Sequence, residues 1–213
     1  MKIRVLIADD HAVMRDGLSA FLTASSGIEV VAQASDGREA VRQVAELAPD
    51  VVLMDIAMPG LNGIEAVRAI REQRSPARLV MLSMHSTSEH VYRAFEAGAD
   101  GYLLKESAGT EVLAAVRSVH RGRRYVSRAL GHIGLELRSE SSRSSPLDRL
   151  SARERQVLQL VVEGKSSMEI STIVHLSPKT VETYRSRMMK KLGVGDVTAL
   201  VKFALNHGIT SLD

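Results

Sequence analysis

Acidic side chains follow two short apolar runs in the first sixty residues. Asp9 and Asp10 come directly after the run Ile3–Ala8, and Asp55 ends the run that begins at Val51. A short apolar run between turn residues is typical of a buried strand in a parallel sheet. Ligands of such sheets bind in the crevice outside the carboxyl ends of the strands, so we expect the three carboxylates to meet there.

Three carboxylates at one edge repel each other unless a cation lies among them. Oxygen ligands favour a hard ion, and Mg²⁺ takes one or two carboxylates, keeps several waters and binds phosphate oxygens. Ser83 and Lys105 end two later apolar runs. The lysine can neutralise a phosphoryl oxygen and the hydroxyl can donate to another, which leaves Asp55 as the nucleophile that forms an acyl phosphate. The pattern predicts Mg²⁺-dependent phosphoryl chemistry at Asp55.

Strand and helix patterns alternate five times between residues 1 and 121, with links of a few residues. The expected strands are 3–8, 29–34, 51–55, 78–83 and 100–104. This alternation predicts an α/β fold with a doubly wound, five-stranded parallel sheet of the flavodoxin-like type. Right-handed crossovers place the carboxyl ends of all strands at one edge, so residues far apart in the sequence converge on one crevice.

The last third of the chain carries four helical patterns and no strand pattern. Ser151 and Glu154 form a capping box at the start of the first helix. Ser177 and Pro178 begin the third helix as an N-cap with proline at the first helical position. We therefore predict a separate all-α domain over residues 149–213.

Cations and hydroxyls share one face of the third helix in this domain. The apolar face of that helix carries Val181, Tyr184, Met188 and Leu192. A short helix, a tight turn and a helix with a basic face are typical of a helix-turn-helix, whose second helix enters the major groove. Lysine and arginine reach phosphates or guanine edges, and serine and threonine contact either. The residues expected to contact DNA are Lys179, Thr180, Thr183, Ser186, Arg187 and Lys190.

Residues 122–148 separate the two patterned regions. The serine-rich run 138–145 predicts a flexible linker, and residues 125–137 are a candidate for one short helix.

Charge is divided unequally between the two regions on either side of the linker. Residues 1–121 carry 13 Lys and Arg against 16 Asp and Glu, net −3, while residues 149–213 carry 10 against 6, net +4. The basic tail indicates a polyanionic partner.

The composition limits the other classes of protein. The chain has no cysteine, which excludes a disulfide framework, a thiolate nucleophile and a cysteine-based zinc site. No run approaches ~18 apolar residues, and the apolar start is too short for the core of a signal peptide. With 213 residues and 45% hydrophobic content, we expect two small domains of a soluble, cytoplasmic protein without a membrane partner.

Residues 1–121 resemble the receiver domain of bacterial response regulators. The residues that carry the resemblance are Asp9, Asp10, Asp55, Ser83, Tyr102 and Lys105. It implies that Asp10 and Asp55 bind Mg²⁺ directly, that Asp9 acts mostly through water, and that the backbone carbonyl of Ala57 is a further ligand. It also implies phosphorylation at Asp55.

The same resemblance assigns roles to three further residues. Ser83 would move onto the phosphoryl group, Tyr102 would swing inward behind it, and Lys105 would pair with the phosphate. Charge added at Asp55 would then bias a pre-existing two-state element. Our hypothesis is that the element is the release of the recognition helix from the receiver, together with dimerisation.

Residues 149–213 resemble the LuxR-type output domain, and the whole chain resembles the NarL/FixJ family. The motifs are Leu150-Ser-Ala-Arg-Glu-Arg155, Glu163-Gly164-Lys165, Ser177-Pro-Lys-Thr-Val-Glu-Thr183 and Lys190-Lys-Leu-Gly193. The resemblance implies a two-component response regulator that is phosphorylated by a sensor histidine kinase and binds promoter double-stranded DNA as a homodimer. RNA polymerase is a candidate partner. Glu182, an acid beside the DNA-binding face, leaves the base contacts there open.

Two other functions fit parts of the pattern. A Mg²⁺-dependent phosphohydrolase also forms an aspartyl phosphate, but it would need a second acid two residues after the nucleophile, where this chain has Ala57. A DNA-binding regulator controlled by a protein partner would not need phosphorylation. We expect the phosphorylated regulator, with no catalytic residue for turnover of a substrate.

Overall fold

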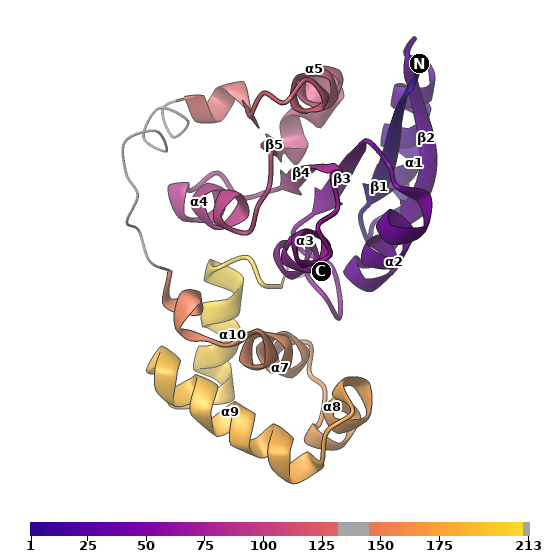
Figure 1. Ribbon diagram of the computed structural model, residues 1–213. Coiled ribbons are helices and arrows are strands. Elements are labelled where there is room, and N and C mark those ends of the chain that lie inside the picture. The colour runs from indigo at the N-terminus through magenta and orange to yellow at the C-terminus, as the bar shows by residue number, and fades with distance from the viewer. Residues whose placement is uncertain (132–144, 211–213) are drawn as a thin grey trace. The chain divides into compact units, whose positions relative to one another are not determined.

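The computed structural model describes residues 1–131 and 145–210, which fall into two compact units (Figure 1). The first unit contains every strand of the described residues, and the second is helical. Residues 122–131 belong to the first unit and residues 145–148 to the second. Both ends of the predicted linker are therefore part of the two units. Most of the serine-rich run lies outside the described residues.

The first unit is built on one sheet in the order β2-β1-β3-β4-β5-β6. Its strands are β1 (Ile3–Ala8), β2 (Ile28–Ala34), β3 (Val51–Asp55), β4 (Arg78–Ser83), β5 (Gly101–Leu104) and β6 (Tyr125–Val126). Every neighbouring pair is parallel. The doubly wound parallel sheet is confirmed, but the prediction of five strands is wrong by one.

The sixth strand was not indicated by the sequence. Tyr125 and Val126 pair with Gly101 and Tyr102 of β5, at a place where we predicted the start of a short helix. A strand of two residues is too short to show alternation of apolar and polar side chains. A 3-10 turn at Arg128–Leu130 follows, and its last residue is buried in the core. Residues 132–137 of the predicted helix lie outside the described residues.

Helices cover both faces of the sheet. The helices on one face are α1 (Ala12–Thr23) and α5 (Ala108–His120), and those on the other are α2 (Gly37–Leu47), α3 (Gly63–Glu72) and α4 (Ser88–Glu96). Two hydrophobic clusters lie between these helices and the sheet. The central strands are buried on both sides, which explains why the segments 5–8 and 51–54 are apolar without alternation.

The second unit contains α7 (Ala152–Val162), α8 (Ser167–Val174), α9 (Pro178–Leu192) and α10 (Val197–Asn206) around a core of its own. The predicted capping box is confirmed, because Ser151 Oγ accepts from Glu154 N–H and Glu154 Oε2 accepts from Ser151 N–H. Ser177 caps α9 as predicted, and Gly193 ends it in the left-handed conformation at φ 68°. Within residues 1–131 and 145–210, no helix is long and apolar enough to cross a membrane.

Candidate functional sites

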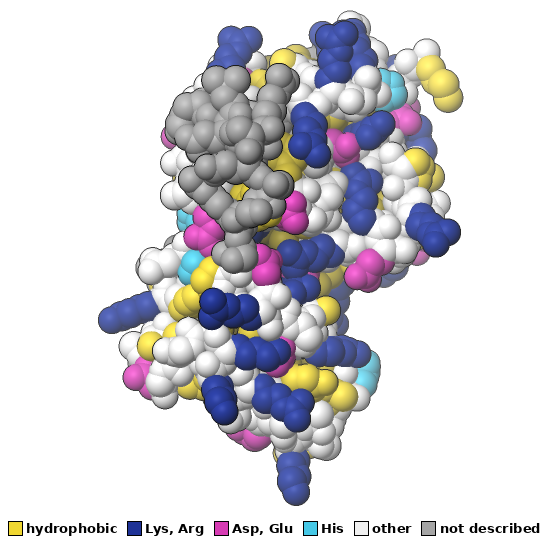
Figure 2. Space-filling view, turned by 60° about the vertical axis from the view of Figure 1, so that its left-hand side comes forward, with side chains coloured by type: hydrophobic (Ala, Val, Ile, Leu, Met, Phe, Trp, Pro, Cys, Tyr) yellow, Lys and Arg dark blue, Asp and Glu magenta, His cyan; other side chains and the backbone are white. Residues whose placement is uncertain are grey.

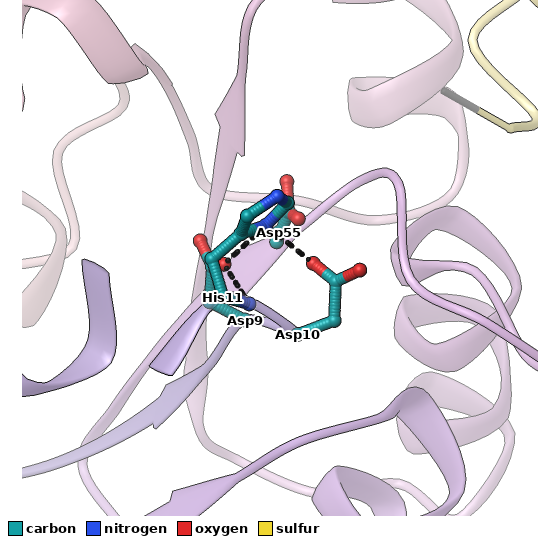
Figure 3. Close-up of side chains that lie close together, drawn as sticks. All are labelled: Asp9, Asp10, His11 and Asp55. Carbon is teal, nitrogen blue, oxygen red and sulfur yellow. Dashed lines mark hydrogen bonds and ion pairs between the residues drawn. The ribbon is translucent and has the colours of Figure 1, made fainter. Parts of the chain in front are cut away.

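The acidic side chains lie where the strand order reverses. From β1 the chain continues to β2 on one side and later returns to β3 on the other, and ligands of such sheets bind at the carboxyl ends of the two strands where the order reverses. Asp9 and Asp10 follow β1, and Asp55 ends β3. These carboxylates and the ring of His11 each offer one ligand atom, and the four atoms lie within 4.8 Å of one another (Figure 3). The structure thus brings the predicted acids together.

Lys105 joins this cluster from the carboxyl end of β5. Its Nζ lies 2.9 Å from Asp9 Oδ2 and 2.9 Å from Asp55 Oδ2. Burial raises the pKa of Asp55 to about 6, the charge of Lys105 opposes this rise, and the charges of Asp9 and Asp10 add to it. Burial by itself lowers the pKa of Lys105, but the charge of Asp55 and the contacts to both carboxylates outweigh it, so the net shift of that pKa is upward.

The three carboxylates of the cluster carry more negative charge than the single ammonium of Lys105 neutralises. Asp9 Oδ2 and Asp55 Oδ2 are shielded from solvent and each lies 2.9 Å from the ammonium of Lys105, and the shielded Asp10 Oδ1 lies 2.8 Å from His11 Nδ1. Carboxylates that share one ammonium are costly to bury, and their oxygens match the ligands that Mg²⁺ prefers. The residues present therefore fit a hard divalent cation.

His11 contacts the acids in a way that the sequence did not predict. It occupies the N-cap position of α1. Its Nδ1 lies 2.8 Å from Asp10 Oδ1 and 3.3 Å from Asp9 Oδ1, while the side chain is 57% exposed. The ring therefore lies at the solvent side of the acidic cluster.

The backbone around Asp55 is held at close range by α3. Gly63 begins this helix, and its N–H donates to the carbonyl of Ile56. A Cβ at position 63 would lie 1.9 Å from the carbonyl oxygen of Asp55, so only glycine fits there. Ala57, the predicted backbone ligand, lies half-buried in the loop between Asp55 and this helix.

Ser83 and Tyr102 lie on neighbouring strands beside the acidic cluster. Ser83 ends β4 and is buried, and its Oγ accepts from the N–H of His85. Tyr102 is fully buried, and its hydroxyl donates to the carbonyl of His85 at 2.8 Å. Burial raises the pKa of Tyr102 well above its ordinary value. The tyrosine that we expected to swing inward already lies inward in this structure.

The predicted DNA-contacting side chains form an exposed face of α9. Lys179, Thr183, Ser186, Arg187 and Lys190 are exposed, and Thr180 is half-buried. On the other side of the helix, Val181 and Met188 are fully buried, with Tyr184 and Leu192 packed at the edge of the same core. In the lower part of Figure 2, Lys and Arg side chains stand on the visible surface of the second unit.

Two charged residues beside this face have structural contacts. Glu182 accepts hydrogen bonds from Ser167 and Arg185, which joins α9 to the start of α8. Lys191 Nζ lies 2.6 Å from Glu154 Oε2 and therefore points to the capping box of α7 rather than along the exposed face. Glu182 is thus held at the contact between α8 and α9.

Comparison with known proteins decides the family. Residues 5–117 match the response regulator receiver domain, and residues 148–204 match the luxR family of bacterial regulatory proteins. The chain belongs to the LuxR-type response regulators. Relatives in this family are transcriptional regulatory proteins, which supports transcriptional regulation as the function of this chain.

Relatives of this response regulator match it over nearly its whole length. Response regulator UvrY of Escherichia coli K12 is 38% identical over 212 residues, which cover 99% of this chain and 97% of the relative. Transcriptional regulatory protein LiaR of Bacillus subtilis 168 is 40% identical over 96% of this chain and 98% of its own. A solved RcsB–DNA complex matches with a TM-score of 0.59 at 25% identity, over 97% of this chain and 99% of that chain.

Proposed function

We propose that this response regulator receives a phosphoryl group on Asp55 from a sensor histidine kinase and then binds promoter DNA as a homodimer. The observation that supports this most directly is the buried cluster in which Lys105 lies between Asp9 and Asp55, with Asp10 beside them. A regulator that only bound DNA would have no evident use for so costly a group of charges.

The proposed transfer uses Asp55 as the nucleophile. A carboxylate oxygen attacks the phosphorus of the kinase's phosphohistidine, the phosphorus–nitrogen bond breaks, and the imidazole leaves. Bound Mg²⁺ would neutralise charge on the phosphoryl oxygens. It would be held by Asp10, Asp55 and the carbonyl of Ala57, with Asp9 acting through water.

Lys105 then exchanges one partner for another. Its ammonium now pairs with the carboxylate of Asp55, and after transfer it pairs with a phosphoryl oxygen bound to the same residue. The contact to Asp9 orients the ammonium in both states. Ser83 donates its hydroxyl to a second phosphoryl oxygen, and its oxygen can still accept the hydrogen bond from His85 N–H.

The output follows from a shift in population between two states of the receiver. The phosphoryl group favours the state in which Ser83 and Lys105 contact it, while Tyr102 stays in the inward position that it already has in this structure. This state would release α9 from contact with the receiver and favour dimerisation. A dimer places two recognition helices on two half-sites of the DNA, where the exposed cations of α9 contact phosphates and base edges.

The test is footprinting of promoter DNA with the full chain, with and without acetyl phosphate and Mg²⁺. We expect acetyl phosphate to strengthen protection on the order of tenfold for the wild-type chain and not at all for Asp55→Asn. Sedimentation of the same samples should show a dimer only when the wild-type chain is phosphorylated. Equal protection by both chains under all conditions would favour a regulator that works without phosphorylation.

A further inference from the structure

Ser127 bridges two backbone positions of β5 from the segment that leads toward the second unit. Its N–H donates to the carbonyl of Tyr102 at 2.9 Å, and its Oγ accepts from the N–H of Leu104 at 3.1 Å. The side chain is fully buried. One serine thus binds the strand at Tyr102 and again directly before Lys105, two residues of the phosphorylation site.

A buried carboxylate holds this serine in place. Glu111 lies on α5, is 8% exposed, and accepts three hydrogen bonds at Oε2. The donors are the hydroxyl of Tyr125 at 2.7 Å, Oγ of Ser127 at 3.2 Å and the N–H of Arg128 at 3.2 Å. All three belong to one short segment, so the carboxylate attaches residues 125–128 to the receiver.

The three hydrogen bonds to Glu111 should form and break together. An ionised carboxylate is strongly disfavoured in a buried site unless it is hydrogen-bonded, and the three donors to Glu111 all come from residues 125–128. Detaching the segment would expose Glu111 to water and break the pairing of β6 with β5. A detached form would therefore lose these contacts together rather than one at a time.

We propose that Glu111 and Ser127 couple the phosphorylation site to the chain segment that leads to the DNA-binding unit. The inference rests on the proposed phosphorylation of Asp55 and adds the path by which it acts. Lys105 must leave the carboxylate of Asp55 for a phosphoryl oxygen, and the hydrogen bond from Leu104 N–H to Ser127 lies one residue away. Movement at this end of β5 changes how well Ser127 is bound, and docking of Ser127 in turn changes the position of Lys105.

The matched pair of variants is Ser127→Ala and Ser118→Ala in the full chain. Ser118 lies on α5 and its hydroxyl donates to the carbonyl of Arg123, outside the Glu111 cluster. The measurements are the fraction of Asp55 phosphorylated by acetyl phosphate with Mg²⁺ and the ratio of DNA affinities with and without it. We expect the Ser118→Ala chain to keep the wild-type ratio of DNA affinities, on the order of tenfold. In the Ser127→Ala chain this ratio should fall below about twofold, although Asp55 is still phosphorylated.

Hydrogen exchange on the same proteins separates coupling from a loss of structure. In the wild-type chain, acetyl phosphate should change exchange at residues 125–130, and in Ser127→Ala the change should be confined to the phosphorylation site. Glu111→Gln, which keeps the shape but removes the charge, should reduce both effects. Wild-type ratios and exchange in both Ser127→Ala and Glu111→Gln would overturn the coupling while leaving the proposed function intact. Failure of the wild-type chain to be phosphorylated would overturn both.

Discussion

Lys105 and Asp55 form an ion pair of 2.9 Å from Nζ to Oδ2, with 9% and 2% of their side chains exposed. The pair joins the ends of β5 and β3, two strands that are not neighbours in the sheet. Because the ammonium also contacts Asp9, one positive charge serves two buried carboxylates. The stability and the metal affinity of the receiver therefore depend on the same lysine.

Lys105→Met should destabilise the metal-free receiver and increase its response to Mg²⁺. Removing one partner of a buried pair leaves uncompensated carboxylates, and we expect a decrease of about 3–5 kcal/mol in the free energy of unfolding. Mg²⁺ should recover much of this decrease because it no longer competes with the ammonium. The measurement is thermal unfolding across a Mg²⁺ titration, with the exposed Lys2→Met as the control. Equal Mg²⁺ responses in the two variants would contradict this dependence on Lys105.

Asp55→Asn should change how stability depends on pH in the absence of metal. Burial raises the pKa of Asp55 from 3.8 to about 6 in the folded chain, so its contribution to stability is fully present below pH 3.8 and is lost as the pH rises through 6. The neutral variant avoids that loss. We expect it to be more stable than the wild-type chain by about 3 kcal/mol at neutral pH.

This advantage of Asp55→Asn should shrink as the pH falls through about 6 and vanish near the ordinary pKa of 3.8. Denaturant unfolding in EDTA at a series of pH values measures it. Asp16→Asn, which removes an exposed acid from α1, is the matched control and should show no such trend. If the free energies of unfolding of Asp55→Asn and the wild-type chain differed by the same amount at every pH in this range, the pKa of Asp55 would not be raised in the folded chain.

Substitutions on α9 should weaken DNA binding in proportion to the charge they remove. Arg187 and Lys190 are exposed on the proposed DNA-binding face, and removing one phosphate interaction should lower the slope of log affinity against log salt by about 1. Gel-shift titrations of Arg187→Ala and Lys190→Ala at several salt concentrations measure this. Lys202→Ala removes an exposed cation from α10 and serves as the control. A wild-type slope in both α9 variants would exclude this face.

Lys191→Met should destabilise the second unit, whereas Lys190→Met should not. Lys191 binds the buried Glu154 at 2.6 Å, and breaking this ion pair should lower the free energy of unfolding by about 1–3 kcal/mol. Burial alone raises the pKa of Glu154, but the hydrogen bonds from Lys191 and Ser151 outweigh it and hold the pKa below its ordinary value. The contribution is therefore present above pH 4.5 and lost as the pH falls. Equal unfolding curves for the two lysine variants would show that the ion pair does not stabilise the unit.

The sequence predicted those parts of the fold that carry a periodic pattern. The strands at 3–8, 51–55 and 78–83 have the predicted bounds, because buried parallel strands leave clear apolar signals. The capping residues Ser151 and Ser177 were also identified, since their side chains act on neighbours three residues away. Local chemistry of this kind is visible without the tertiary structure.

Contacts made across the fold were not visible in the same way. β6 is held by pairing with β5 and by the contacts of Ser127, none of which produces a local pattern. Glu111 did leave a signal, because it is an acid on the apolar face of α5 beside Val112. The contact of His11 with Asp10 depends on a rotamer at the start of α1, and no spacing rule specifies that.

Phosphorylation at Asp55 is tested most directly by mass spectrometry of the full chain after incubation with acetyl phosphate and Mg²⁺, with borohydride reduction to trap an acyl phosphate. The proposed mechanism predicts one modified residue, Asp55, and no modification when Mg²⁺ is removed or when the chain carries Asp55→Asn. Modification at another carboxylate, or an unmodified wild-type chain under conditions that preserve its fold, would contradict the mechanism.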